Sequence, residues 1–357
     1  MHWIERQFSK GQINRAGQIL VETGVNPDVR AQAISVLDNW RACHAYPLQV
    51  IKMTLLNRAK KIDKNALIAQ RLKRRPSVEI KLRDNPNMSL SQMQDIGGCR
   101  AVLKTMKEVN RLIDHYKAYH AKSPKDRSSW DGSEDFDYIS KPKPDGYRSM
   151  HLIFRFHSPS EERKVFNGQR IEIQVRSNLQ HVWATAVETA QIFTGQALKS
   201  KVKDASEQWL RFFALTSSAF ALREKCPTVP GIPTNKSDLV CELRDIVEHS
   251  NIMQSLTSWS DTIYLLEEKE TTDANAFLLI LDPAAHSLRV EPFTKLQMEE
   301  AQIAYETAEK NTESDSNKQV VLVSVDDLDS LRRAYPNYYV DTKDFVSAVQ
   351  REISLTG

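Results

Sequence analysis

The fold is predicted mainly from one stretch, Lys141–Arg176, which reads KPKPDGYRSMHLIFRFHSPSEERKVFNGQRIEIQVR. It opens with a basic turn, because prolines and an Asp-Gly pair restrict the backbone while lysines and one tyrosine project from it. Met150–Phe156 then alternates apolar and polar residues, which predicts a half-buried strand. The pair Asn167-Gly168 is a hairpin signal, so Lys164–Phe166 and Gln169–Arg176 are expected to pair across it.

The second strand of this hairpin carries an unusual polar face. Side chains alternate between the two faces of a strand, so Glu172, Gln174 and Arg176 share one side. A carboxylate, an amide and a guanidinium in a row are not typical of a solvated edge. They favour a site that handles phosphates and a metal ion.

Composition places this 357-residue chain among globular proteins, since 41% hydrophobic residues can build one large core or two smaller ones. The net charge of +3 is unevenly distributed. Lys52–Arg83 holds eleven Lys or Arg against two acids, whereas Gln297–Ser330 holds nine acids against two lysines. The asymmetry favours nucleic-acid binding, association of the two parts, or both; solvated helix faces are the alternative.

Cysteine spacing and hydropathy exclude several classes of protein. The four cysteines are scattered, without a Cys-x-x-Cys pair, which argues against structural zinc and against a disulfide framework. No apolar run reaches the roughly 18 residues needed to cross a bilayer, so no membrane association is expected. The N-terminus has no signal-peptide core, and a soluble, cytoplasmic protein is expected.

A change in composition divides the chain. Residues 226–236 hold three prolines and a glycine, and this segment is interpreted as a linker. It separates residues 1–225 from residues 237–357. The second part is expected to begin with helical sequence from Ser237 to about Glu270, followed by a strand hairpin, an acidic helix and a further strand.

Three groups of residues could carry chemistry. The first is a cationic group at the start of a helix, suited to anions: Arg71, Lys73, Arg74, Ser77 and Lys81. The second is a pair of carboxylates, Asp95 and Glu172, which could hold a divalent metal. The third lies on or just after the rigid turn: Tyr147, Arg148 and His151. Phosphoryl-type transfer needs cations and a metal against the phosphates, and an aromatic ring to stack on a base.

Four segments closely resemble the synthetase domain of the RelA/SpoT family, in the family's order: RLKRRPS, DIGGCR, KPDGYRSMH and IEIQVRS. The resemblance covers about Leu48 to Phe220. It implies an α/β (α+β) fold with a mixed, nucleotidyltransferase-like β-sheet flanked by helices. It also implies an ATP-dependent pyrophosphokinase, which moves the β,γ-pyrophosphate of ATP onto a ribose 3′-hydroxyl. One departure is Gly-Gly-Cys before Arg100, where the family usually has Ala/Phe, Gly/Ala and Ile/Val.

The resemblance assigns roles motif by motif. ATP binding falls to Arg71 and Arg100 around adenine, and to Lys73, Ser77 and Lys81 on the phosphates. Asp95 would bind Mg²⁺, and Glu172 would support the metal or accept the proton of the attacking hydroxyl. The acceptor would be held by Tyr147 stacking on its base, by Gln174, and by Arg148 and His151 near phosphates.

The chain has no His-Asp dipeptide, so the family's hydrolase site is not expected. Residues 237–357 resemble the C-terminal part of CapRel-like fused toxin–antitoxin proteins, among the toxic small alarmone synthetases. That resemblance implies a smaller α/β, zinc-finger-like module without metal, which acts as an antitoxin. Tyr335 and Tyr338 would form its Tyr-x-x-Tyr motif and block the nucleotide site. The alternative is that these tyrosines only anchor the last helix.

The acceptor is expected to be the 3′-CCA end of tRNA. The cations that exceed the needs of one nucleotide support this: Lys60, Lys61, Lys64, Arg74 and Arg75. A phage protein, with capsid protein among the candidates, would bind residues 237–357 and release the enzyme in anti-phage defence. One alternative is synthesis of (p)ppGpp or (p)ppApp. A second is a catalytically inactive, nucleic-acid-binding sensor.

Overall fold

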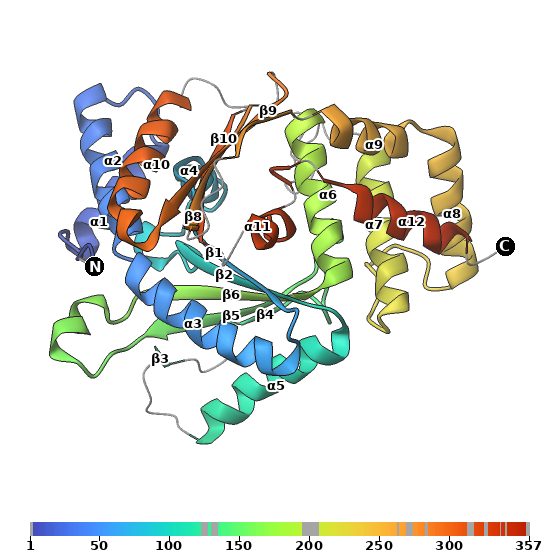
Figure 1. The fold of residues 1–357 in the computed structure, drawn as a ribbon, viewed down its shortest axis with the longest axis horizontal. Helices are drawn as coiled ribbons and strands as arrows, with labels where there is room; N and C mark the ends of the chain where they lie inside the picture. The colour runs from blue at the N-terminus through green and yellow to red at the C-terminus, as the bar shows by residue number, and fades with distance from the viewer. Residues whose placement is uncertain are drawn as a thin grey trace.

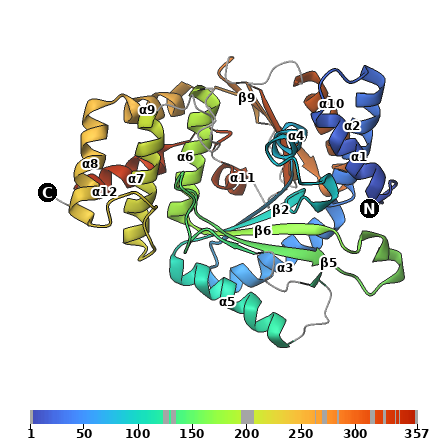
Figure 2. The same ribbon diagram turned by 180° about the vertical axis from the view of Figure 1, so that it is seen from behind.

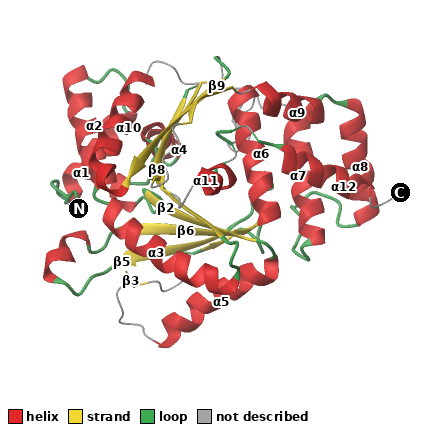
Figure 3. Ribbon diagram, in the orientation of Figure 1, coloured by secondary structure: helices red, strands yellow, loops and turns green. Residues whose placement is uncertain are grey.

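The computed structural model describes residues 3–122, 128–129, 135–194, 207–262, 264–268, 274–282, 285–312, 318–324, 328–335, 337–339 and 341–354. Within these ranges the chain forms a ten-stranded mixed sheet with helices around it (Figures 1 and 3). The strand order is β3-β5-β6-β2-β1-β10-β8-β9-β7, and β4 pairs with β5. The mixed α/β class predicted from the sequence is confirmed.

Three helices precede the first strand: α1 (Lys10–Val21), α2 (Pro27–Ala42) and α3 (Ala45–Ile62). A capping box at Ser9 begins α1, and a proline at the first position begins α2. Helices α1 and α2 share a core with α4 (Arg75–Asp84) and the short η1 (Leu90–Gln92).

The strand with the polar face predicted from the sequence is β6 (Arg170–Ser177). It lies in the sheet with β1 (Leu67–Leu72), β2 (Gly97–Leu103) and β5 (Met150–Phe156). Strand β2 runs parallel to β6 and antiparallel to β1. Ile171, Ile173 and Val175 pack into one core with α3 and α5 (Met106–Lys122). The opposite face of β6 turns toward α6 (Asn178–Thr194) and α11 (Leu328–Ala334) (Figures 1 and 2).

The hairpin expected at Asn167-Gly168 is wrong in its details. β6 does pair antiparallel with a preceding strand, but that strand is β5. Lys164–Phe166 belongs to a 3₁₀ helix, η2 (Glu161–Phe166). Gly168 has the positive φ of 85° expected of a turn residue, yet it closes a long loop, with its N–H bonded to the carbonyl of Phe156. Burial of Phe166, packed against Tyr46 at 4.9 Å between ring centroids, holds this loop on the protein.

The C-terminal part continues the same sheet. Strand β10 (Gln319–Ser324) pairs antiparallel with β1 and with β8 (Ala274–Asp282), which pairs with β9 (Ser287–Thr294). The expectation of helix to about Glu270 is wrong, because α9 (Ile252–Thr262) gives way to β7 (Tyr264–Glu268). The zinc-finger-like character of this part stays a prediction.

A second group of helices lies at the opposite end of the molecule from α1 and α2 (Figures 1 and 2). It packs α7 (Glu207–Arg223), α8 (Lys236–His249), α9 and α12 (Lys343–Ser354) beside α6. Phe345 of α12 contacts the rings of Phe212, Phe213 and Phe220. The remaining elements are β3 (Ser128–Ser129), β4 (Phe136–Asp137), η3 (Lys295–Gln297) and α10 (Met298–Thr312). No helix in the described ranges is long and apolar enough to span a bilayer.

Candidate active site

A small cavity of about 50 Å³ lies over the polar face of β1, β2 and β6. Its lining includes seven residues that the sequence singled out: Arg71, Lys73, Asp95, Arg100, Glu172, Gln174 and Tyr335. The strand register explains how they meet. Arg71 lies opposite Gly98, which lies opposite Glu172, while Arg100 lies beside Gln174.

Gly98 keeps this cavity open. It stands in the middle of the cross-strand row between Arg71 and Glu172, and a Cβ built there would meet no atom within 4 Å. The departures from the family pattern, Gly97 and Cys99, belong to the other face of β2. A Cβ on Gly97 would approach the Cδ1 of Ile171 to 2.7 Å, so glycine allows β2 to pack closely there. The unusual Gly-Gly-Cys therefore alters the core and leaves the site face unchanged.

Asp95 is held by two lysines. Lys73 Nζ lies 2.8 Å from one carboxylate oxygen and Lys81 Nζ lies 2.9 Å from the other. Burial alone would raise the pKa of Asp95, but these two cations hold it well below its usual range. Ser77 lies in the first turn of α4, the same helix that carries Lys81. The group expected to hold ATP phosphates is thus assembled around an ionised carboxylate.

Glu172 anchors a chain of hydrogen bonds across β5 and β6. Its carboxylate lies 2.8 Å from Nδ1 of His151 and accepts a bond of 2.7 Å from the amide of Gln174. The other ring nitrogen of His151 lies 2.9 Å from the hydroxyl of Tyr147, and Arg176 donates to Gln174. Burial raises the pKa of Glu172, but His151 outweighs it and the net shift is downward. Glu172 is therefore a carboxylate, suited to bind a metal or accept a proton.

Tyr147 depends on the turn before it. Gly146 has φ 96°, and a Cβ there would lie 2.8 Å from the ring of Trp183 and 3.0 Å from Ser217. Only glycine satisfies both the backbone angle and the close approach. The tyrosine ring meets Lys143 Nζ at 5.3 Å, and Arg176 lies 6.0 Å from its centroid. An aromatic ring is thereby fixed at the edge of the site.

The two acidic side chains in the cavity fit a magnesium site. Asp95 and Glu172 both line it, and the charge of Asp95 acts to raise the pKa of Glu172. Among the described residues there is no cluster of three or more His, Cys, Asp or Glu able to enclose a metal. Two carboxylates without such a cluster suit Mg²⁺, which keeps waters and takes further ligands from substrate phosphates.

The expected acceptor-binding cations lie in separate places. Arg148 is buried, with Nε donating to Ser217 and Nη1 to the carbonyl of Ile139. Arg75 is buried beside Asp38 and Glu309, and Arg74 donates to the side chain of Gln319. Three exposed lysines stay on the surface near the end of α3: Lys60, Lys61 and Lys64. The structure does not bring these six residues together.

Tyr335 forms part of the wall of the small cavity. Its hydroxyl donates to the carbonyl of Gln70 at 3.1 Å, and Arg100 lies 5.9 Å from its ring centroid. Burial raises the pKa of Tyr335 to about 12, so it is a neutral phenol. Tyr338 is also buried, with its ring centroid 6.4 Å from that of Tyr335. Both tyrosines contribute to raising the pKa of Arg71.

Sequence reasoning missed the residues that dock the end of α11. Arg100 donates to the carbonyl of Ala334 at 3.3 Å, and Nε2 of His181 lies 2.9 Å from the carbonyl of Arg333. Arg100 is a cationic donor of the kind that commonly satisfies the free carbonyls at a helix C-terminus. His181, whose pKa burial lowers to about 3, donates to its carbonyl as a neutral ring. Glu188, one step of seven residues after His181 on α6, contributes negative charge near Arg71 and Arg100. The spacing of these two ionisable residues on α6 was the available signal.

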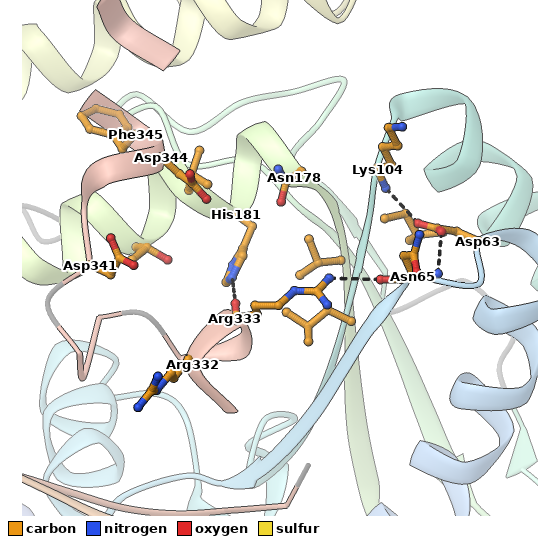
Figure 4. Close-up of a pocket in the computed structure, with 15 residues that line it drawn as sticks. Asp63, Asn65, Lys104, Asn178, His181, Arg332, Arg333, Asp341, Asp344 and Phe345 are labelled. Atoms are coloured by element: carbon orange, nitrogen blue, oxygen red, sulfur yellow. Dashed lines mark hydrogen bonds between the residues drawn. The ribbon is translucent and has the colours of Figure 1, made fainter. Parts of the chain in front are cut away.

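A larger cavity of about 390 Å³ lies beside α11, between the ends of β1 and β2, α6 and the start of α12 (Figure 4). His181 and Arg333 line it, and Arg333 donates to the carbonyl of Asn65 at 3.3 Å. Lys104, Asp341 and Asp344 give it charges of both signs. None of the predicted catalytic or ATP-binding residues lines this cavity.

Comparison with known proteins finds a family model that matches the centre of the chain. Residues 70–195 match the model described as "Region found in RelA / SpoT proteins". These residues are therefore similar to that region. The match runs from β1 to α6 and includes the predicted catalytic and ATP-binding residues. No curated protein matches the chain.

Solved structures give weaker likenesses. Small alarmone synthetase 2 from Bacillus subtilis is 18% identical, with TM-score 0.41, over 52% of this chain and 93% of that one. Small alarmone synthetase 1 from the same organism, bound to its product pppGpp, is 17% identical, with TM-score 0.43, over 53% and 93%. A GTP pyrophosphokinase family protein from Streptococcus pneumoniae is 18% identical, with TM-score 0.36, over 57% and 90%.

Proposed function

We propose that this chain is an ATP-dependent pyrophosphokinase and that residues 237–357 hold it inactive in the arrangement described. The observation that carries the proposal is the position of Tyr335. Its ring shares a cavity with Arg71 and Arg100, which the resemblance assigns to adenine, and with the carboxylates of Asp95 and Glu172. A ring beside two guanidinium groups uses the same contacts that a purine base would use.

In the active state the side chains around Asp95 would change partners. Lys73 and Lys81 would move from the carboxylate of Asp95 to the phosphates of ATP, which would leave Asp95 able to hold Mg²⁺, with Glu172 either as a second ligand or as the proton acceptor. The metal would neutralise phosphate charge. The acceptor 3′-oxygen attacks the β-phosphorus, the bond from that phosphorus to the oxygen bridging the α-phosphate breaks, and AMP leaves. In its role as proton acceptor, the carboxylate of Glu172, which His151 and Gln174 orient, takes the proton of the hydroxyl.

For the acceptor we propose the 3′ end of tRNA. The exposed lysines near the end of α3 support it, because a chain of phosphates can be contacted at several points. Synthesis of (p)ppGpp or (p)ppApp is the second candidate, favoured by the RelA/SpoT region itself. Tyr147 could stack on either kind of base.

Release of the C-terminal part requires a partner that prefers the open state. Switching the population from mostly closed to mostly open needs a differential affinity of about 5.5 kcal/mol. We propose that a phage protein supplies it by binding residues 237–357, in the manner of a fused toxin–antitoxin system. The cavity of Figure 4 lies at the junction of both parts and would change on opening.

Transfer of label from γ-³²P-ATP tests the function. Bulk tRNA, GDP, GTP and AMP are supplied separately to the full chain, to Tyr335→Ala and to Tyr335→Ala with Glu172→Gln. Label on tRNA from Tyr335→Ala alone is expected. Label on a nucleotide with tRNA blank would establish the second candidate. No label on any acceptor from Tyr335→Ala, alone or combined with Glu309→Gln, would reject the pyrophosphokinase.

A further inference from the structure

A buried polar network joins α10 to α2 and to the start of α4, away from Tyr335. Arg41 is 1% exposed, Tyr305 2% and Glu309 5%. Nη1 of Arg41 lies 3.1 Å from the Glu309 carboxylate, and its Nη2 donates to the hydroxyl of Tyr305. That hydroxyl donates in turn to Glu309 at 2.6 Å. Three side chains from segments more than 260 residues apart thus form one fully buried unit.

Glu309 also reaches the first residue of α4. It accepts a hydrogen bond of 3.2 Å from the main-chain N–H of Arg75, and the Nε of Arg75 lies 3.3 Å from its other oxygen. The residue before the helix, Arg74, supplies no side-chain cap. A carboxylate at a helix N-terminus satisfies a free donor and interacts favourably with the helix dipole. Helix α4 is therefore capped from the C-terminal part of the chain.

Arg41 extends this contact to Lys73. Its Nε donates to the carbonyl of Lys73 at 2.8 Å, so the network touches the backbone on both sides of Arg74. Lys73 and the α4 residues Ser77 and Lys81 form the group assigned to the ATP phosphates. By contrast, Tyr335 lies at Arg100 and the carbonyl of Gln70, on the adenine side.

We propose that Glu309 and Tyr305 form a second inhibitory contact, which holds the phosphate-binding segment Lys73–Lys81 in its closed arrangement independently of Tyr335. This inference rests on the proposed function. Opening must separate Glu309 from Arg41 and Arg75. Burial alone would lower the pKa of Arg41, and Tyr305, Glu309 and Asp38 raise it. Asp38 lies on α2, 3.1 Å from Nη1 of Arg41, and would stay with Arg41 on opening. The charge that loses its buried cationic partners is therefore that of Glu309, and this loss makes the contact resist opening.

The two contacts restrain different parts of the nucleotide site, so releasing one of them does not release the other. A partner that lifts only the tyrosine segment frees the adenine side, and α10 still restrains the phosphate side. Full activity then requires displacement of α10 as well as α11, which lie on separate parts of the C-terminal segment (Figure 1).

The test compares charge removal at two positions of α10 in the full chain. Glu309→Gln removes the buried carboxylate charge. Tyr305→Phe removes only a hydroxyl, so it still tests the contact if Glu309→Gln does not fold. Glu299→Gln, at an exposed position in the first turn of α10, is the matched control. Each is made alone and with Tyr335→Ala. Pyrophosphate transfer from γ-³²P-ATP and hydrogen exchange of the peptide spanning α4 are measured.

Glu309→Gln with Tyr335→Ala is expected to transfer label at least about tenfold faster than Tyr335→Ala alone. Tyr305→Phe should act in the same direction by a smaller factor. Exchange at the start of α4 should rise in both variants and stay unchanged in Glu299→Gln and in Tyr335→Ala.

Rates and exchange equal to those of Glu299→Gln, in folded Glu309→Gln and Tyr305→Phe, would overturn the second contact while Tyr335→Ala remains active. Absence of transfer from every variant, Tyr335→Ala included, would instead overturn the proposed function, and the inhibitory role of Glu309 with it.

Discussion

The hydroxyl of Tyr335 donates a hydrogen bond to the main-chain carbonyl of Gln70 at 3.1 Å. Gln70 belongs to β1, where it pairs with Ser324 of β10 and with Cys99 of β2. The tyrosine is therefore tied to the strand that carries Arg71, and its ring lies next to Arg100. A residue 265 positions away in the sequence from Gln70 thus lies beside Arg100, one of the two arginines that the resemblance assigns to the adenine base.

The hydroxyl and the ring of Tyr335 should contribute differently to closure. Tyr335→Phe loses one hydrogen bond, worth about 1 kcal/mol, and ATP affinity should rise roughly fivefold. Tyr335→Ala also loses a buried ring, so affinity should rise by a further factor on the order of ten or more. Titration calorimetry with ATP and Mg²⁺ measures both. Tyr339→Ala, outside the cavity, serves as control, and equal affinity for the Ala variant and the unaltered chain would contradict the blocking role.

Glu172→Gln should abolish transfer when placed in the Tyr335→Ala background. Loss of a positioned proton acceptor typically costs a factor of about 10² to 10⁴. The Mg²⁺ dependence separates the two roles open to this carboxylate. If Glu172 accepts the proton, kcat falls at saturating Mg²⁺ and the Mg²⁺ concentration for half-maximal rate is unchanged. If it binds the metal, that concentration rises. A variant as active as its parent would remove Glu172 from the reaction.

Much of the site could be predicted from the sequence because strand periodicity is local. The alternation in β6 places Glu172 and Gln174 on one face, and the structure keeps them there. The turn before Tyr147 was also recognisable, since Gly146 requires a positive φ. A parallel pairing joins β6 to β2, two segments about 75 residues apart, and so brings Glu172 near Asp95. Only the family resemblance could predict this long-range pairing.

The wrong predictions also come from contacts between segments that are distant in the sequence. Lys164–Phe166 looked like a hairpin strand, but burial of Phe166 against Tyr46 favours a 3₁₀ turn. Arg75 looked like a surface cation until the fold brought Asp38 and Glu309 to it. A charged residue reveals neither its burial nor its partner when the partner lies more than 200 residues away.

The continuous sheet changes how the C-terminal part should be removed. Truncation near Pro230, within the linker of residues 226–236, would uncover the β1 edge that pairs with β10. It would also expose the aromatic cluster around Phe345. Exposed strand edges and apolar clusters promote aggregation. The truncated chain should therefore be less soluble than Tyr335→Ala, which centrifugation after expression will show, and a soluble monomer of residues 1–230 would contradict this.

Gly146→Ala should destabilise the protein and displace Tyr147. The new Cβ would lie 2.8 Å from the Trp183 ring and 3.0 Å from Ser217, at φ 96°. Backbone strain of about 1 kcal/mol and a steric clash of about 1–3 kcal/mol add together. Gly168→Ala separates the two terms, because its φ is 85° and no atom lies within 4 Å of its Cβ. Denaturant unfolding should show the larger loss at Gly146, and equal losses would rule out the clash.

Acid should destabilise the folded chain through His181. Burial, with Arg100 and Arg176 nearby, lowers the pKa of His181 from its ordinary value of 6.5 to about 3. Below pH 6.5 the unfolded chain therefore binds a proton that the folded chain does not. The free energy of unfolding falls by about 1.4 kcal/mol for each pH unit contributed by this group, until pH approaches its folded pKa. Urea unfolding between pH 6.5 and 4.5 should show a slope of unfolding free energy against pH that is shallower by one proton in His181→Gln, whose amide can still donate to the Arg333 carbonyl.

His249 provides the control. Asp245 raises the pKa of His249, which gives it the opposite linkage, so His249→Gln should not flatten the slope. An unchanged slope in His181→Gln would mean that this imidazole is protonated in the folded protein, and the neutral donor assigned to it at the end of α11 would be wrong.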